Sequence, residues 1–339
     1  MIIIQLAGGL GNQMFQYALY LQLKSLGKDV KVDDVTGFAQ DDKRNPALSP
    51  FGISYERVSR KELERMLDSS PLPWNKVRRR LCGRKKKSYF EEDKKYHHEI
   101  MTWDDIYLEG YWQTEKYFAK ISDEIKKILD TDKLLEYLGN NGLADNPVKS
   151  ASAALFDKKV SDRLTMDDWL ERITSTESVS VHIRRGDYLL PENRTLFGNI
   201  CTAAYYRNAM DEMKQQYPDC RFYLFTNDKE WIKERIDECI RTGAAAKDPQ
   251  TGGVKPAYAD SYCDTENIEV VDLGEEDDYA EFVLMSKCKH NILANSSFSW
   301  WASYLNKNPN KTVLAPGRWL NGWDCEDYYR KDMRKVNAG

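Results

Sequence analysis

Short apolar runs that alternate with helix-like patterns are the feature that most constrains the fold of this chain. Residues Ile2 to Leu6 predict a buried strand, and the glycine-rich stretch AGGLG follows directly. Apolar residues then recur at helical spacing as far as Gly27, a residue type that commonly ends helices. The stretch KDVKVD predicts a second strand. A strand, a crossover helix and a second strand make a βαβ unit, so we expect a parallel sheet near the N-terminus.

The same alternation returns in the second half of the chain, from about Ser178. Strands are predicted for SVSVHI, RFYLFT, IEVVDL, NILA and TVLAP, and helices for AYYRNAMDEMKQQ, KEWIKERIDECIR, YAEFVLMSKC and SFSWWASYL between them. Before this half, IYLEGYW predicts a strand and EKYFAKISDEIKKIL an amphipathic helix, whereas residues 36–99 read as polar and irregular. The stretches 139–147 and 243–260 are rich in turn formers and predict loops.

The length of 339 residues favours two domains. We predict an α/β fold with an N-terminal domain over residues 1–174, a C-terminal domain over 175–318 and a tail over 319–339, for which packing on the N-terminal domain is one option. The net charge of −4 argues against a general nucleic-acid-binding protein. Seven scattered cysteines without a CxxC pair suggest neither a disulfide framework nor a thiolate zinc site. With no signal peptide or spanning segment predicted, we expect a cytoplasmic protein.

The glycine-rich turn after the first strand has more than one interpretation. Two glycines of AGGLG and the later Asp33 imitate the G-x-G-x-x-G motif and the distant acid of a dinucleotide site. However, Met14 stands where the third glycine would be, and the helix starts with Asn12 and Gln13. These amides can bind sugar hydroxyls as well as phosphates. A tight turn with Asn12 as helix cap is the structural alternative.

The stretch VSVHIRRGDYLLPE carries the most informative polar residues. An apolar strand ends here in His182, Arg184, Arg185 and Asp187. Ligands of open α/β sheets bind beyond the carboxyl ends of the strands, and arginine forks match phosphate oxygens. Because adjacent strand residues point to opposite faces, one arginine can serve a ligand while the other anchors Asp187. A structural Arg–Asp ion pair is the alternative.

Two further strand ends lie in the same half. In NILANSSFSWW, Asn295, Ser296 and Ser297 precede a helix whose first N–H groups could bind a phosphate, or the serines could simply cap the helix. In LFTNDKE, Asn227 and Asp228 could pair with a purine base or cap the next helix. Three polar strand ends together predict a nucleotide-diphosphate site.

Metal ligands are scarce, because the chain has four histidines. Asp130 and Asp132 form a D-x-D of the kind that holds a divalent ion on some sugar nucleotides, but they read better as a solvated helix end. We therefore expect arginine and a helix dipole to neutralise the diphosphate, with no metal. The basic run from Lys76 to Lys87 is either a solvated loop or a contact surface for anionic lipid at the inner face of a membrane.

The stretches GGLGNQMFQYA, GYWQTEKYF, HIRRGDY, NSSFSWWASYL and VLAPGRWL together resemble the α-1,2-fucosyltransferases of glycosyltransferase family eleven. They occur in the family's order and span Gly8 to Leu320. The resemblance implies a GT-B-like architecture, in which two facing Rossmann-like domains enclose an interdomain cleft. It also implies GDP-fucose as donor and a metal-independent, inverting transfer without a cofactor.

Residue roles also follow from the resemblance. Arg184 would hold the β-phosphate and stabilise the departing GDP, Asn12 would lie at the reacting sugar, and the general base would be Asp187, Glu192 or no residue at all. The implied donor-binding residues are His182, Arg184, Arg185, Asn227, Asp228, Asn295, Ser296, Ser297 and Phe298, and the implied acceptor-binding residues are Asn12, Gln13, Trp112 and Glu115.

We therefore predict a fucosyltransferase that acts on the 2-hydroxyl of a terminal β-galactoside such as lactose or a glycan end. A transferase for another nucleotide sugar and a non-catalytic nucleotide- or glycan-binding protein are the alternatives.

Overall fold

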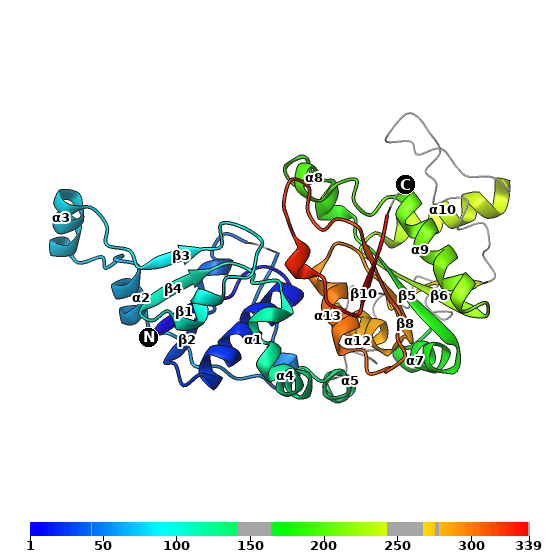
Figure 1. The fold of residues 1–339 in the computed structure, drawn as a ribbon, viewed down its shortest axis with the longest axis horizontal. Helices are drawn as coiled ribbons and strands as arrows, with labels where there is room; N and C mark the ends of the chain where they lie inside the picture. The colour runs from blue at the N-terminus through cyan, green and yellow to red at the C-terminus, as the bar shows by residue number, and fades with distance from the viewer. Residues whose placement is uncertain (42, 142–163, 243–266, 275–277, 338–339) are drawn as a thin grey trace, which may run out of the picture. The chain divides into compact units, whose positions relative to one another are not determined.

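The computed structural model describes residues 1–41, 43–141, 164–242, 267–274 and 278–337 and divides into two compact units (Figure 1). Unit 1 consists of Met1–Leu129 and Asp324–Arg330, and unit 2 of Asp130–Trp323 and Lys331–Gly339. Each unit has a sheet in which every recorded strand pair is parallel. The predicted α/β fold with two Rossmann-like domains is confirmed in these two sheets.

The sheet of unit 1 has the strand order β2-β1-β4-β3. Its strands are β1 (Ile2–Gln5), β2 (Val30–Asp33), β3 (Ser88–Phe90) and β4 (Ile106–Glu109). Its helices are α1 (Leu10–Ser25), α2 (Arg60–Met66), α3 (Pro73–Cys82) and α4 (Ser122–Ile128). The predicted βαβ unit is therefore present as β1, α1 and β2, and β1 is buried because it lies between β2 and β4.

Two predictions about unit 1 are wrong. The region 36–99 is not irregular throughout, because it contains α2, α3 and β3. The stretch EKYFAKISDEIKKIL is not one helix: it begins as two 3-10 turns, Glu115–Tyr117 and Ala119–Ile121, and only then continues as α4. The backbone of Phe118 between these turns has φ −134° and ψ 17°, which is not helical, and its side chain is fully buried. Packing of Phe118 thus overrides local helical propensity.

The sheet of unit 2 has the strand order β10-β9-β8-β5-β6-β7. Its strands are β5 (Glu177–Ile183), β6 (Cys220–Thr226), β7 (Ile268–Val270), β8 (His290–Ile292), β9 (Val313–Pro316) and β10 (Met333–Val336). The helices are α5 (Thr131–Asn140), α7 (Met166–Ser175), α8 (Pro191–Phe197), α9 (Ala203–Gln216), α10 (Lys229–Thr242), α12 (Asp278–Lys287) and α13 (Ser297–Leu305). The strands and helices predicted for this half all occur, whereas β10 was not predicted.

The sheet of unit 2 contains one point at which the direction of strand addition reverses. In unit 2 the chain runs outward from β5 to β6 and β7, then returns to β8 on the other side of β5 and continues to β9 and β10. This is the strand order of the dinucleotide-binding Rossmann fold, and ligands of such sheets bind at the carboxyl ends of the two strands that flank the reversal. In unit 1, β4 pairs with β1 in parallel, so the residues that follow these two strands lie at the same edge of the sheet.

The division into units differs from the predicted boundaries at 174 and 319. Helix α5 belongs to unit 2, where it packs on α12 and where Lys307 pairs with Asp130 and Asp132. Residues 131–141 therefore join the C-terminal unit, although they precede the predicted boundary by more than thirty positions.

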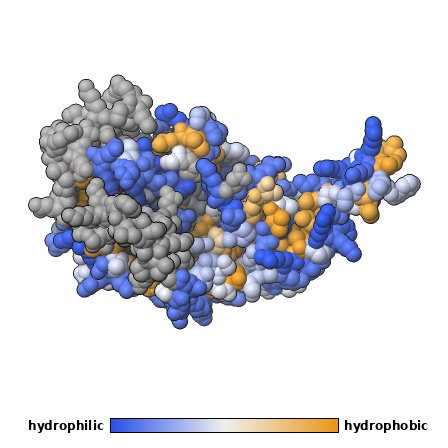
Figure 2. All heavy atoms as spheres, turned by 180° about the vertical axis from the view of Figure 1, so that it is seen from behind, coloured by the Kyte–Doolittle hydropathy of each residue, from blue (hydrophilic) through white to orange (hydrophobic). Residues whose placement is uncertain are grey.

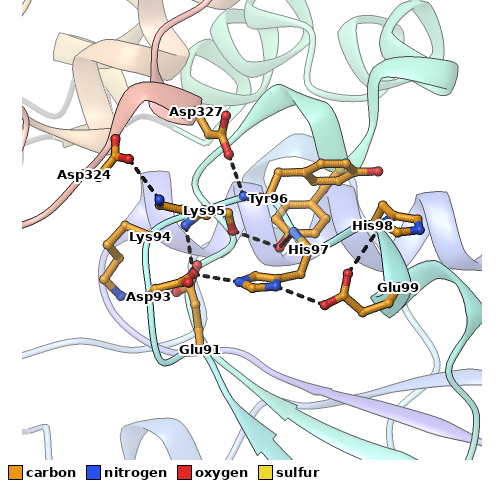
Figure 3. Close-up of polar contacts among 11 residues, drawn as sticks. Glu91, Asp93, Lys94, Lys95, Tyr96, His97, His98, Glu99, Asp324 and Asp327 are labelled. Atoms are coloured by element: carbon orange, nitrogen blue, oxygen red, sulfur yellow. Dashed lines mark hydrogen bonds and ion pairs between the residues drawn. The ribbon is translucent and has the colours of Figure 1, made fainter.

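The tail is divided between the units. Residues Asp324–Arg330 belong to unit 1: the Tyr96 N–H donates to Asp327 at 2.7 Å, and Lys95 pairs with Asp324 at 3.0 Å (Figure 3). Beyond them, β10 adds to β9 as an edge strand of unit 2, with Met333 opposite Val313. Two consecutive exposed basic residues, Arg334 and Lys335, precede the buried Val336, and exposed charges of this kind suit an edge strand.

Candidate active site

The arginine loop of unit 2 lies at the reversal point of its sheet, directly after β5. Gly186 has φ +56°, and a Cβ there would come within 2.6 Å of the Asn227 side-chain nitrogen, so both the backbone conformation and the space require glycine. The Arg185 N–H donates to Asn227 Oδ1 at 2.9 Å. Asn227 therefore holds the turn of the loop, and this contact uses the amide oxygen that the sequence assigned to a ligand.

Arg185 is fixed by two partners that both come from the end of β6 and the start of α10. Its Nε donates to Asp228 Oδ2 at 3.0 Å, and its guanidinium carbon lies 3.6 Å from the ring centroid of Trp231. Asp228 also accepts the Trp231 N–H at 3.3 Å and so caps α10. Among the described acids, Asp228 is thus the one that pairs with the arginine loop. The Arg185–Asp228 pair therefore supports the conformation of the loop.

Arg184 carries the second guanidinium of the loop and is half-buried. Its guanidinium carbon lies 5.8 Å from the ring centroid of Tyr188, whose hydroxyl donates to the backbone oxygen of Asn295 at 2.9 Å. Tyr188 therefore links the loop after β5 to the segment after β8. These are the two strand ends at which the Rossmann order predicts a ligand.

His182 is buried near the end of β5 and is neutral at pH 7. Burial, followed by the charge of Arg184, lowers its pKa to about 3. Among the described residues its Nδ1 has no hydrogen-bond partner, and its ring packs against Phe298 with centroids 5.7 Å apart. A buried polar atom normally has a partner, so this nitrogen is available for a hydrogen bond to a bound molecule.

Helix α13 starts at the end of β8, beside the arginine loop. Ser296 is its N-cap residue, and its side chain accepts the Phe298 N–H at 3.3 Å. Asn295 is occupied structurally: its amide nitrogen donates to the backbone oxygen of Trp319 at 3.1 Å, and its oxygen accepts from the Cys201 thiol. The positive end of the helix dipole therefore lies at the same edge of the sheet as the arginine loop.

The two candidate bases are placed differently. Glu192 is the second residue of α8 and is exposed to solvent. Asp187 belongs to the short 3-10 turn Gly186–Leu189 that follows the arginines, and its side chain lies outside the described part of the chain.

In unit 1 the glycine-rich turn leads into α1, but the acid of the dinucleotide motif is already used. Asp33 is buried and accepts the Val35 and Thr36 N–H groups, both at 3.1 Å, and the Tyr107 hydroxyl at 2.7 Å. A Cβ on Gly37 would come within 2.1 Å of the Leu6 backbone oxygen, so the next loop packs against the end of β1. Asp33 is thus hydrogen-bonded to groups of its own unit.

The two amides at the start of α1 have different surroundings. Gln13 is fully buried; its nitrogen donates to the backbone oxygens of Gly8 and Asn45, at 2.8 and 2.9 Å, and its oxygen accepts the Ala47 N–H at 2.7 Å. Gln13 thus connects the glycine-rich turn with residues 45–47. Asn12 is half-buried and accepts from the Gln113 side chain at 2.6 Å.

The motif GYWQTE follows β4 and lies beside this turn. Trp112 has φ +56°, unusual for a bulky residue, and is fully buried, with its Nε1 lacking a hydrogen-bond partner among the described residues. The Tyr111 N–H donates to Glu91, a buried carboxylate whose pKa is raised by burial. Glu115 is half-buried at the first 3-10 turn. Asn12 and the residues after β4 thus meet beyond the carboxyl ends of β1 and β4.

The acids of the D-x-D stretch are paired with lysines. Asp130 caps α5 by accepting the Asp132 N–H at 2.8 Å, and Lys307 donates to Asp130 at 2.8 Å and to Asp132 at 2.6 Å. Ion pairing with Lys287 and then Lys307 lowers the pKa of Asp132. No cluster of three or more His, Cys, Asp or Glu suited to a metal occurs within the described ranges. Nor does any helix in those ranges have the length and apolar character needed to cross a bilayer.

Comparison of the sequence with known protein families identifies a family of enzymes. The model of the family described as Glycosyl transferase family 11 matches residues 158–256 and 258–332, slightly more than half of the chain. The chain belongs to glycosyl transferase family 11. The match includes the arginine loop, Asn227, Asp228 and the start of α13, and the family predicted from the sequence motifs is confirmed.

Two curated relatives of this family 11 chain cover most of its length, and a third covers part of it. It is 27% identical to an alpha-1,2-colitosyltransferase of Escherichia coli over 95% of both chains. It is 26% identical to the O-antigen biosynthesis glycosyltransferase WbnK of the same species over 94% of both. Human galactoside alpha-(1,2)-fucosyltransferase 1 is 30% identical over 38% of this chain and 28% of its own. Family membership and these relatives identify an enzyme that transfers sugars.

Solved structures overlap with the chain only loosely. POFUT1 in complex with GDP-fucose is 11% identical, with a TM-score of 0.38 over 93% of this chain and 97% of that one. The ADP-heptose LPS heptosyltransferase II of Escherichia coli is 11% identical, with a TM-score of 0.40 over 99% and 90%. TM-scores below 0.5 are too low to support an argument about activity.

Proposed function

We propose that this family 11 enzyme transfers L-fucose from GDP-fucose to the 2-hydroxyl of a terminal β-galactoside, with inversion and without a metal ion. The observation that carries the proposal is the arginine loop at the reversal point of the unit 2 sheet. There Arg184, the neutral His182 and the start of α13 share one edge. A guanidinium and a helix N-terminus are the groups expected to bind a diphosphate in the absence of a divalent ion.

In the proposed reaction the acceptor hydroxyl oxygen attacks the anomeric carbon of fucose. The bond from that carbon to the β-phosphate oxygen breaks, and GDP leaves with the bonding electron pair. Arg184 stabilises the charge that develops on the β-phosphate, while Arg185, held by Asp228 and Trp231, keeps the loop in place. The acceptor proton passes to Asp187, to Glu192, or directly to solvent along a dissociative route.

We assign the acceptor side to unit 1, with Asn12 as its principal side chain. Asn12 is the half-buried amide of the glycine-rich turn, whereas Gln13 has its hydrogen bonds satisfied by backbone groups. Trp112 is fully buried, so in this conformation it supports the acceptor side from the interior of unit 1.

Transfer of colitose is the second candidate, because a full-length relative is an alpha-1,2-colitosyltransferase. Colitose is fucose without its 3-hydroxyl, so the two donors offer the same diphosphate and differ at one sugar carbon. A site that hydrogen-bonds the 3-hydroxyl would reject the colitosyl donor strongly, whereas a site that packs an apolar group there would discriminate weakly.

The test is transfer from a panel of nucleotide sugars to lactose, with the product linkage determined by NMR. We expect the highest kcat/KM with GDP-fucose and an α-1,2 linkage to galactose. A higher kcat/KM with GDP-colitose would replace fucose as the donor. Binding of GDP without transfer to lactose or to any other β-galactoside would support a non-catalytic protein.

A further inference from the structure

Helix α3 stands apart from the core of unit 1 and carries an exposed apolar face. None of its ten residues is buried. Trp74, Val77 and Leu81 are 79%, 50% and 79% exposed, and Leu72 before the helix is 61% exposed. In Figure 1, α3 projects from the sheet of its own unit, and at that end of Figure 2 apolar side chains lie beside strongly hydrophilic ones.

The three apolar residues form one stripe. Positions 74, 77 and 81 follow the spacing i, i+3 and i+7, which places them on the same side of a helix. Lys76, Arg79 and Arg80 occupy the remaining surface. The helix is therefore amphipathic, and its apolar stripe is left exposed by the described residues of its own unit.

The charge around this stripe has a single sign. Residues 69–90 contain eight Lys or Arg and no Asp or Glu. The whole chain has 50 basic and 54 acidic residues, so outside this segment acids outnumber bases by twelve. The basic residues are thus concentrated on one exposed feature of an otherwise acidic protein.

Some of these basic side chains bind groups of unit 1, whereas others have no acidic partner among the described residues. Asp68 pairs with Arg78, and the Arg79 guanidinium donates to the backbone oxygen of Ser70 at 2.8 Å. Lys86 pairs with Glu109 at 2.7 Å. The side chains of Lys76, Arg80, Arg84 and Lys85 have no acidic partner among the residues that the structure describes. These four remain able to meet an external anionic surface.

We infer that residues 72–87 form a peripheral membrane-binding element that inserts Trp74, Val77 and Leu81 among anionic lipid headgroups. An amphipathic helix with a basic polar face and a Trp on its apolar face lies in the plane of a bilayer interface. Anionic lipid supplies the complementary charge, whereas a symmetric contact with a second copy would bring eight basic residues against eight. The inference does not depend on the identity of the transferred sugar.

The test is flotation of the full chain with vesicles of phosphatidylcholine alone or mixed with one quarter phosphatidylglycerol, at 0.1 M salt. We expect binding to the mixed vesicles only, weakened by 0.5 M salt. Each basic residue near an anionic surface contributes about fivefold to partitioning. Arg80→Glu with Arg84→Glu should therefore weaken binding by about 25-fold or more. The matched control, Lys61→Glu with Lys120→Glu, makes the same change in net charge on exposed residues outside the segment.

The apolar stripe is tested separately. Trp74→Ser with Leu81→Ser should abolish flotation, whereas the exposed residues Leu26 and Val35, changed to Ser together, should leave it intact. Because α3 buries none of its residues, these variants should keep the wild-type Tm. Equal binding to both vesicle types, or equal losses in the control variants, would overturn the inference. A different outcome would also overturn it: light scattering shows a dimer without lipid, and Leu81→Ser dissociates that dimer. The stripe would then bind a second copy of the chain.

Discussion

The Arg185 guanidinium carbon lies over Trp231, 3.6 Å from its ring centroid, while the Arg185 Nε donates to Asp228 at 3.0 Å. One arginine of the loop is thus held on two sides by the segment 228–231, and its partner comes from a strand end 43 residues further along the chain. This relationship separates the roles of the two adjacent arginines. Arg185 supports the loop, and Arg184 is the one proposed to act on the diphosphate.

Replacing Arg185 with Ala should lower both stability and donor affinity. The half-buried stack and ion pair together contribute about 1–2 kcal/mol to the free energy of unfolding, and their loss frees the loop that carries Arg184. Thermal unfolding and the KM for the donor measure the two effects. Arg221→Ala is the control, because this exposed arginine lies 3.8 Å from Glu269 and should contribute no more than about 0.5 kcal/mol. An equal loss of Tm in both variants would remove the supporting role of Arg185.

Arg184→Ala should lose transfer but keep its stability. Loss of a charged donor to a developing phosphate charge costs about 10²–10³ in kcat. Arg184→Lys should recover little, since an ammonium is a point charge without the planar fork of a guanidinium. The measurements are kcat for transfer and Tm for both variants. Near-normal turnover in Arg184→Ala at an unchanged Tm would show that another group stabilises the departing GDP.

The sequence predicted the long, strongly periodic elements. It also predicted that polar residues gather at one edge of the unit 2 sheet. It could not predict β3 or β10, because a three-residue strand and a basic edge strand depend on a neighbour for their pairing. It assigned Asp187 as the acid near the arginines, whereas the described ion pair is with Asp228. Sequence spacing alone favours an ion pair between residues that are close in the chain. The parallel pairing of β5 with β6 places Thr226 opposite Ile183, and so brings Asp228 near the arginines that follow β5.

A similar limit applies to the first turn. In the sequence, Gln13 cannot be distinguished from a ligand-binding amide like Asn12. Only the return of residues 45–47 to the turn shows that backbone groups satisfy its side chain. A buried, fully bonded amide at a helix start is a structural feature that no local pattern reveals.

Transfer should continue in excess EDTA. Asp130 and Asp132 are paired with lysines, and the proposed diphosphate partners are a guanidinium and a helix N-terminus. The measurement is the rate of GDP release from GDP-fucose and lactose with EDTA and after re-addition of Mg²⁺ or Mn²⁺. Complete loss of activity that a divalent ion restores would contradict the account of how the leaving group is stabilised.

His97 should make the stability of unit 1 depend on pH. Its ring nitrogens lie 2.7 Å from Asp93 and 3.1 Å from Glu99, and these partners raise its pKa, with the Asp93 hydrogen bond as the largest cause (Figure 3). The charged imidazole therefore stabilises the fold fully below its ordinary pKa of about 6.5, and this contribution is lost as the pH rises through the folded value. At the acid end it is lost when Asp93 and Glu99 become protonated.

The measurement is Tm from pH 4 to 9 for the wild type and His97→Gln. The difference in Tm should be largest near pH 5–6.5 and should shrink towards pH 8–9. His98→Gln is the control, because this exposed ring lies 3.5 Å from Glu99 and has less effect on the fold. A pH-independent difference would mean that His97 acts by packing alone.

The two amides of the opening turn should respond differently to substitution. Gln13→Ala removes three hydrogen bonds to backbone groups, and each buried group left unsatisfied costs about 1–3 kcal/mol, so this variant should unfold at a lower temperature. Asn12→Ala should keep its Tm and its affinity for GDP while kcat/KM for transfer falls, because an interaction made only at the reacting sugar lowers the barrier without tightening the free nucleotide. Calorimetric titration of GDP, beside transfer assays and thermal unfolding, separates the two effects. If Asn12→Ala lost GDP affinity in proportion to its activity, the nucleotide would bind at the first turn of unit 1, and the assignment of the donor to unit 2 would be wrong.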